Sequence, residues 1–98
     1  MVRVRNKLTA RAVATLTTPG KYSDGGSLYL RIDGSETKDE IDRRRWIYRF
    51  PWRGRVREMG LGGFPDISLA EARKARDLAQ DLVRQGKDPI YAREEARR

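Results

Sequence analysis

The sequence predicts a small α+β domain, in which a short N-terminal helix precedes a three-stranded antiparallel sheet packed on one long C-terminal helix. Two segments alternate apolar and polar residues, which is typical of half-buried strands. A later segment carries apolar residues at spacings of three and four, which is typical of an amphipathic helix. With 98 residues, of which 38% are hydrophobic, the chain can bury one core but not two.

The short N-terminal helix is predicted at residues 10–16. Thr9 precedes it and is a favoured N-cap residue, because its hydroxyl can accept a hydrogen bond from a free N–H group of the first turn. Leu8 and Val13 stand at the positions of a hydrophobic staple. The segment TTPGKYSDGG then ends the helix with its proline and glycines, and the first strand is expected after it.

Two strands are predicted from strict alternation. In SLYLRI the leucines and the isoleucine share one face, and in RRWIYRF the three aromatic residues do. The polar segment between them, residues 33–42, is expected to be a loop. The side chains assigned to the core, here and in later elements, are Leu28, Leu30, Trp46, Tyr48, Phe50, Met59, Leu61 and Leu82.

The third strand, RVREMGLG, follows the turn segment PWRG. Its alternation is less regular. Met59 and Leu61 are expected to face the core, which leaves Val56 and Glu58 outward. The same alternation turns Arg55 and Arg57 inward, unless a β-bulge or the strand twist frees them.

The long helix is predicted in PDISLAEARKARDLAQDLVRQGKDP. Ser68 and Glu71 form a capping box, in which each side chain satisfies a backbone N–H group of the other residue. An apolar stripe runs from Leu69 to Val83, and Gly86 favours the end of the helix. This stripe can cover one face of the sheet, so the other face is left to solvent or to a partner.

We assign residues 1–88 to the folded domain and residues 89–98 to the start of a linker. The segment IYAREEARR favours a helix, but it is mostly charged and has little to bury by itself. It is expected to lead toward a further domain.

The composition argues against catalysis. The chain has no cysteine and no histidine, so it lacks thiolate metal sites and the usual general base, and we expect no enzyme activity, metal or cofactor. The segment GLGGF lacks the spacing of a dinucleotide fingerprint and the lysine of a phosphate-binding loop. It is expected to be a tight exit from the third strand, with Phe64 and Ile67 at the core edge. The acidic loop lacks the spacing of a calcium site.

The net charge of +8 indicates a polyanionic partner. Residues 1–32 carry +5, residues 33–42 carry −4, residues 43–57 carry +7, and residues 58–98 are balanced. The arginines of the third range alternate with aromatic residues, so the sheet is expected to present them together on one face. Their planar forks suit phosphates and guanine edges, although a solvated basic face is the plainer explanation of such a run.

The segments KYSDGGSLYLRI, RRRWIYRF and REMGLGGFPDISLAEARKARDLAQDLVRQGKDP together resemble the amino-terminal arm-site DNA-binding domain of phage-type tyrosine recombinases, the integrases of prophages and genomic islands. The resemblance covers about residues 8–91 and is most specific from Leu61 to Arg73. It implies a sheet that lies in the major groove of arm-type sites. It also implies core-binding and catalytic domains elsewhere in the full recombinase, whose catalytic residues match no position here. The acidic loop is longer than is usual in the family, and Ile47 stands where an arginine or another exposed residue is common.

These inferences together predict sequence-specific binding of double-stranded DNA through the exposed sheet face, which positions an integrase on arm-type sites for site-specific recombination. We expect the protein in the bacterial cytoplasm, on the nucleoid when bound, and no apolar run is long enough to span a membrane. Further partners in the full complex would be other recombinase subunits or an accessory DNA-bending protein. Double-stranded RNA and an acidic protein surface are alternative partners.

The predicted DNA-binding residues are of two kinds. Tyr29 and Ile47 are expected to make apolar contacts, for example with a thymine methyl group. The arginines are expected to divide between phosphates and guanine edges. The predicted set is Tyr29, Arg31, Arg45, Ile47, Arg49, Arg53, Arg55 and Arg57.

Overall fold

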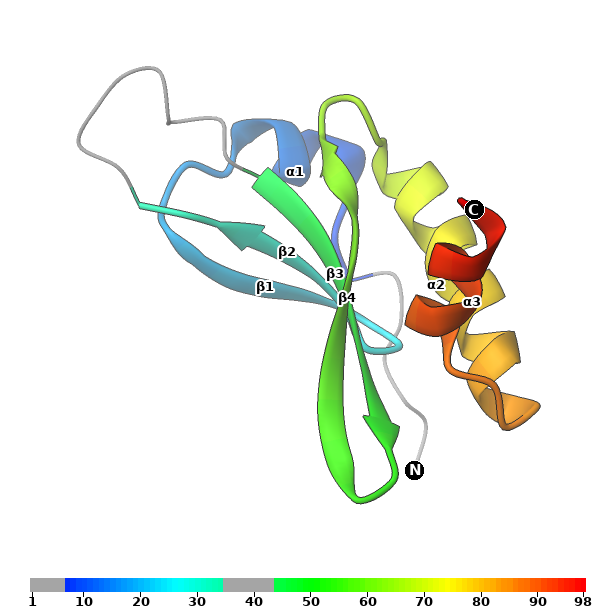
Figure 1. The fold of residues 1–98 in the computed structure, drawn as a ribbon. Coiled ribbons are helices and arrows are strands. Elements are labelled where there is room, and N and C mark those ends of the chain that lie inside the picture. Colours follow the sequence, from blue (N-terminus) through cyan, green and yellow to red (C-terminus); the bar gives the residue numbers. More distant parts are fainter. Residues whose placement is uncertain (1–6, 35–43) are drawn as a thin grey trace.

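The computed structural model describes residues 7–34 and 44–98, which form a four-stranded antiparallel sheet with helices against one face (Figure 1). The sheet order is β1-β2-β3-β4, so each strand pairs with the strand that follows it in the sequence. In chain order the elements are α1 (Ala10–Thr15), β1 (Gly20–Gly25), β2 (Leu28–Ile32), β3 (Arg44–Trp52), β4 (Arg55–Phe64), α2 (Leu69–Arg84) and α3 (Pro89–Ala96). The predicted α+β class and its first and long helices are confirmed, but the predicted number of strands is wrong.

The missing strand is β1, which occupies the segment that we expected only to break the first helix. It pairs with β2 through a two-residue turn, Gly26 and Ser27, whose φ angles are 60° and 65°. Positive φ at both central residues is what a type I′ hairpin turn requires. The glycines that signalled a loop are therefore part of a hairpin, and the apolar alternation that would have revealed the strand is absent from GKYSDG.

The core lies between the sheet and the helices in two clusters. The first contains Val13 of α1 and Leu69 of α2 packed on β2 and β3, and Trp46 at its centre is 0% exposed. Its indole Nε1 donates a hydrogen bond of 2.8 Å to the carbonyl oxygen of Ile67, so the buried polar atom has a partner. The second cluster comprises Tyr48, Phe50, Met59 and Ala79. The other predicted core residues are confirmed, including the half-buried Leu61, but the half-buried Leu82 belongs to neither cluster and lines a cavity between β4, α2 and α3.

Both predicted helix caps are confirmed. Thr9 accepts a hydrogen bond from Ala12 N, and the capping box joins Ser68 and Glu71 at 3.0 and 3.1 Å. The long helix ends before Gly86, which has a φ of +79° as a left-handed helix cap requires. The apolar stripe of α2 faces the sheet, although its neighbour Leu78 is 70% exposed.

Helix α3 has more contact with the domain than the sequence suggests. Asp88 caps its N-terminus by accepting a hydrogen bond of 2.9 Å from Ile90 N, and Pro89 takes the first helical position. Pro89 is buried and Ile90 packs against the second core cluster, so the expectation that this segment has little to bury is wrong at its start. Its role as a linker stays a prediction.

A buried ion pair joins β1 to α2. Asp24 is 0% exposed, and Arg73 donates hydrogen bonds of 2.9 Å to both of its carboxylate oxygens. Leu8 N donates a third hydrogen bond to the same carboxylate, which ties the segment before α1 to the core. Burial by itself raises the pKa of the Asp24 carboxyl. The hydrogen bonds from Arg73 and Leu8 and the charges of Arg73 and Arg76 outweigh this effect and lower that pKa.

Candidate nucleic-acid interface

The sheet face turned away from α1 and α2 is the candidate interface, and we call it the open face. The alternation of buried and exposed residues along β2 and β3 separates this face from the core. The strand register then aligns its side chains in rows, with Lys21 beside Arg31, Arg31 beside Arg45, and Arg49 beside Glu58. The described open-face side chains with a charge or an apolar group are Lys21, Tyr29, Arg31, Arg45, Ile47, Arg49, Pro51, Val56 and Glu58.

The charged residues of the open face differ in how firmly they are held. Arg31 Nε lies 3.3 Å from Asp33 Oδ1 at the end of β2. Glu58 Oε2 lies 3.1 Å from Lys21 Nζ and 3.4 Å from Arg49 Nε, so one carboxylate serves two cations. Arg45 is exposed on β3 and has no ion-pair partner among the described residues. These positions leave cationic groups accessible along three neighbouring strands.

Ile47 lies on the open face as predicted, but it is only 5% exposed. It pairs with Tyr29 on one side and with Gly60 on the other, and it forms part of the floor of a hollow that Arg31, Arg45 and Glu58 also line. Little of the Ile47 side chain is therefore accessible for the predicted contact with a base. Tyr29 is half-buried, so a larger part of its side chain is accessible on this face.

The arginine-rich segment does not lie on one face, so that expectation is wrong. Arg44 is 7% exposed and donates to the carbonyl oxygen of Leu16 from Nε and from a terminal nitrogen, at 3.2 and 2.7 Å. Arg57 lies opposite Phe50, on the helix-covered face, and forms an ion pair with Asp88. Arg44 and Arg57 therefore connect parts of the fold.

The β-bulge that could have freed the inward arginines lies elsewhere in β4. It falls where Trp46 pairs with Gly62 and Ile47 pairs with Gly60, which leaves Leu61 as the additional residue. Arg55, nearer the hairpin turn, therefore keeps the predicted inward parity, opposite Trp52. The binding of DNA by Arg55 and Arg57 stays a prediction.

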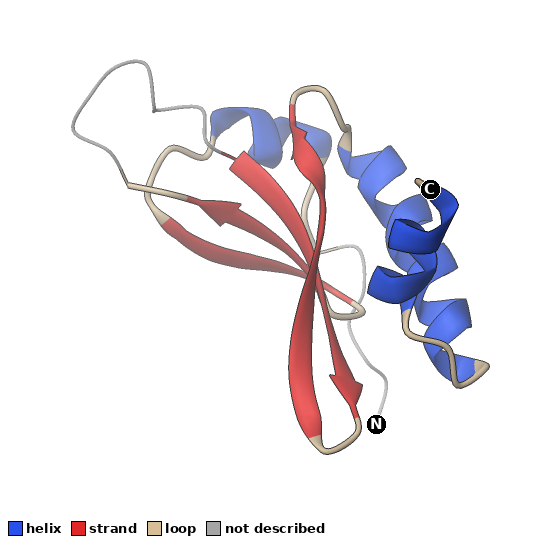
Figure 2. Ribbon diagram, in the orientation of Figure 1, coloured by secondary structure: helices blue, strands red, loops and turns tan. Residues whose placement is uncertain are grey.

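The β3–β4 hairpin extends past the ends of the other strands and past the helices (Figure 2). Arg53 is at its turn with a φ of 50°, and its guanidinium lies 5.7 Å from the centre of the Trp52 ring. Arg53 and Arg55 are both exposed there. The tip is therefore a second cationic surface, separate from the open face and accessible from several directions.

Gly62, in the segment before α2, lies where the packing leaves no room for a side chain. Gly62 has a φ of +109°, and a Cβ atom added there would lie 2.6 Å from Ile67 Cγ1. Phe64 and Ile67 both pack against the first core cluster, as predicted. The run GLGGF lies within β4, where Gly62 allows close packing of the strand on the chain that leads to α2.

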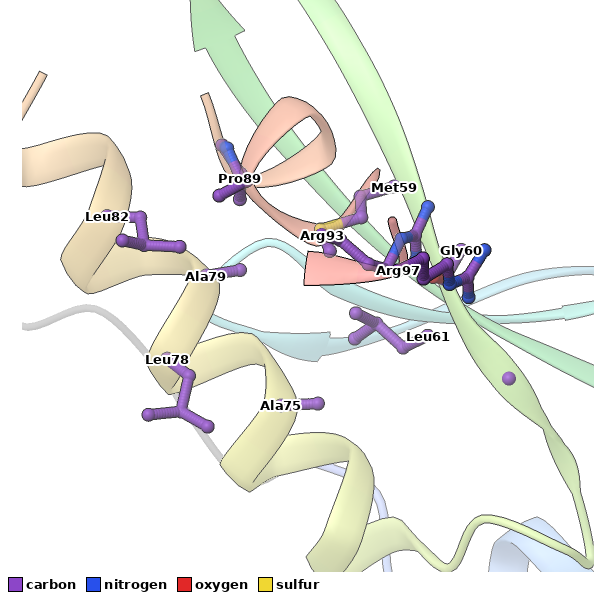
Figure 3. A pocket seen from close by; sticks show the side chains of 12 residues that line it. Met59, Gly60, Leu61, Ala75, Leu78, Ala79, Leu82, Pro89, Arg93 and Arg97 are labelled. Atoms are coloured by element: carbon purple, nitrogen blue, oxygen red, sulfur yellow. The ribbon is translucent and has the colours of Figure 1, made fainter. Parts of the chain in front are cut away.

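A cavity of about 510 Å³ opens on the helix-covered side, between β4, α2 and α3 (Figure 3). Its walls are mostly apolar, from Met59 and Leu61 on the strand to Ala75 and Leu82 on the helix. Arg93 and Arg97 of α3 line its edge (the first donates to the Gly60 carbonyl oxygen). An apolar cavity of this kind offers few groups for phosphates or base edges, so the open face is the better candidate for nucleic acid.

Four residues of the open face that carry a charge or an apolar group were absent from the predicted set: Lys21, Pro51, Val56 and Glu58. Lys21 was missed because its strand was read as a break in the chain. Val56 and Glu58 were expected to face outward, but the predicted set took only tyrosine, isoleucine and arginine side chains from the strands. The acidic residues Glu36, Asp39, Glu40 and Asp42 lie outside the described residues.

The described residues contain no group of three or more potential metal ligands of the histidine, cysteine or carboxylate type. Among these same residues, no helix is both long and apolar enough to cross a membrane.

Comparisons with known proteins agree with a DNA-binding role for this fold. Residues 8–96 match the protein family described as Arm DNA-binding domain. The integrase of Enterobacteria phage P4 is 37% identical over 94 residues, which cover 93% of this chain and 20% of the integrase. A protein named IntB from Escherichia coli (strain K12) is 39% identical over 44 residues, which cover 45% of this chain and 11% of that protein. The chain thus spans about a fifth of the phage integrase.

Proposed function

Because this chain belongs to the Arm DNA-binding domain family, we propose that it binds double-stranded DNA through its open face and so positions an integrase on arm-type sites. The family membership confirms the resemblance to integrase arm domains. The mode of binding is the proposal: the open face enters the major groove, and the tip of the β3–β4 hairpin lies along a phosphate backbone.

The observation that carries this proposal is the row of cations on an uncovered sheet face. Arg31, Arg45 and Arg49 project from the two inner strands, and Lys21 extends the row onto β1. A two-stranded β-ribbon fits the width of the major groove, where each base pair presents its own pattern of donors and acceptors. Arginine can read a guanine there through two parallel hydrogen bonds.

Residues 89–98 would lead, in a full recombinase, toward a core-binding domain, with other subunits or a DNA-bending protein as further partners. Recombination chemistry would then belong to another domain, because this chain has no histidine and no tyrosine that matches a recombinase nucleophile. The present chain would therefore bind arm DNA without cleaving or joining it. A covalent adduct between this chain and a nicked DNA duplex would contradict the assignment of the chemistry to another domain.

Binding selection with random double-stranded DNA tests the proposal directly. The chain should enrich one family of related sites, and a DNA duplex carrying the enriched site should compete far better than an RNA duplex of the same sequence. If about four phosphates are contacted, the logarithm of affinity should fall against the logarithm of salt concentration with a slope of roughly −3.6. Equal competition by the RNA duplex would favour the alternative of shape-based RNA binding.

A further inference from the structure

We propose that Glu58 is a positioning residue for sequence recognition: it holds Arg49 in the orientation that reads a guanine. This inference rests on the proposed function and extends it, because it assigns a role to an acidic side chain on a surface meant for a polyanion. The observation behind it is the arrangement of Glu58, Lys21, Arg49 and Tyr29 on four adjacent strands.

The Arg49 guanidinium has a neighbour on each of two sides. It lies 5.8 Å from the centre of the Tyr29 ring, a distance typical of a cation–π contact. Its Nε atom is buried, makes no hydrogen bond to a described residue, and lies 3.4 Å from Glu58 Oε2. Glu58 is thus the acceptor nearest to an otherwise unsatisfied donor, and the Arg49 side chain is still 41% exposed.

This arrangement leaves the useful end of Arg49 accessible. Neither of its terminal nitrogens donates a hydrogen bond to a described residue, so both can reach O6 and N7 of a guanine. A side chain held near its bound orientation loses less conformational freedom on binding than an unrestrained arginine does. Lys21, at 3.1 Å from the same carboxylate oxygen, restrains Glu58 from the far edge of the sheet.

Electrostatics separates this role from a simple contribution to affinity. A carboxylate on the open face repels the phosphates of every duplex, whatever its sequence. Removing its charge should therefore strengthen binding to random DNA. If Glu58 positions Arg49, the same change should weaken discrimination at one base pair, so the two effects have opposite signs.

The experiment applies binding selection with random DNA duplexes to the wild-type chain, Glu58→Gln and Arg49→Ala. We expect Arg49→Ala to lose its preference for guanine at one position of the enriched site. In Glu58→Gln, the preference for guanine at that same position should fall by at least about fivefold. This factor corresponds to the lower end of the discrimination that a bidentate base contact provides. The affinity of Glu58→Gln for a duplex of random sequence should rise, whereas that of Arg49→Ala should change little.

Two further variants separate charge from position. Glu58→Asp keeps the charge but shortens the reach, so it should bind random duplexes like the wild type and still lose part of the guanine preference. Glu95→Gln removes the same charge from a residue of α3 that is paired with Arg98, and it should leave the preference unchanged. Thermal unfolding of each variant would confirm that equal amounts of folded protein are compared.

The possible failures are distinguishable. If the wild type binds specifically but Glu58→Gln keeps the guanine preference while binding all duplexes more tightly, Glu58 acts only through its charge and the positioning role is wrong. The same holds if Arg49→Ala loses no base preference. If the wild type enriches no sequence and has no measurable affinity for duplex DNA, the proposed function fails, and this inference with it.

Discussion

The arginines of this domain fall into two groups with the same chemistry and opposite environments. Arg44, Arg73 and Arg76 lie at the sheet–helix boundary, where each donates to carbonyl or carboxylate oxygens of another segment. Arg31, Arg45 and Arg49 lie on the open face, where carboxylates pair only some of them, and at ion-pair rather than hydrogen-bond distances. The first group connects the fold, and the second has donors left for a ligand.

The number of arginines in a segment therefore does not measure the capacity of that segment to bind DNA. Arg44 and Arg45 are neighbours in the sequence, yet Arg44 is buried on a carbonyl group and Arg45 is exposed. Alternation along a strand assigns them to opposite faces. Mutations in the two groups should therefore separate stability from binding.

The largest effect is expected from the buried pair. Asp24→Ala would leave Arg73 without its carboxylate and Leu8 N without an acceptor, and it should lower the free energy of unfolding by about 3 kcal/mol. Chemical denaturation would measure this loss. DNA affinity per folded molecule should stay the same, because Asp24 is fully buried at the core. A loss of affinity in a variant of unchanged stability would overturn the separation of the two groups.

Acid should remove the same interaction gradually. The pKa of Asp24 is lowered in the folded protein, against about 3.9 in the unfolded chain, so its stabilising contribution is fully present above pH 4 to 5. It is lost as the pH falls through the lower, folded-state pKa. The difference in unfolding free energy between the wild type and Asp24→Asn should therefore be constant near neutral pH and shrink below about pH 4. Glu71, whose pKa is also lowered, is present in both proteins and does not enter the difference.

An intermediate effect is expected on the open face. Arg49→Ala should cost about 1–3 kcal/mol of binding free energy on the enriched site and little on random duplexes. Arg84→Ala is the matched control, because Arg84 is 67% exposed on α2 and pairs only weakly, at 3.6 Å, with Asp81. Fluorescence anisotropy with both duplexes measures the two affinities. Equal losses in the two variants would move the interface from the sheet to the long helix.

The sequence predicted those parts of the fold that depend on local patterns. The capping box and the stripe of α2 follow from residues within one helix, and the core aromatic residues of β3 follow from simple alternation. Strand β1 was missed because GKYSDG has no alternation of its own and becomes a strand only by pairing with β2. The information that makes this segment a strand lies in its pairing partner β2, and a pattern within the segment cannot reveal it.

The candidate site was less predictable for a related reason. The parity of β4 correctly turned Arg57 inward, but its partner, Asp88, is 31 residues away and belongs to a helix whose packing the sequence did not reveal. Lys21 and Glu58 are 37 residues apart and meet across the open face. Contacts of this length depend on how the sheet curves and on which elements cover it, and neither is encoded in spacing.

The smallest effect is expected from Arg53, at the tip of the β3–β4 hairpin. Arg53 is exposed at a turn, next to Trp52, and no carboxylate of the described residues pairs with it. If it contacts one phosphate, Arg53→Ala should weaken the enriched site and random duplexes alike and flatten the salt dependence of binding by about one unit of slope. Arg49→Ala, measured over the same salt range, should reduce specificity more than slope. A sequence-dependent loss for Arg53→Ala would instead mean that the tip enters a groove, and that base reading extends along the hairpin beyond the open face.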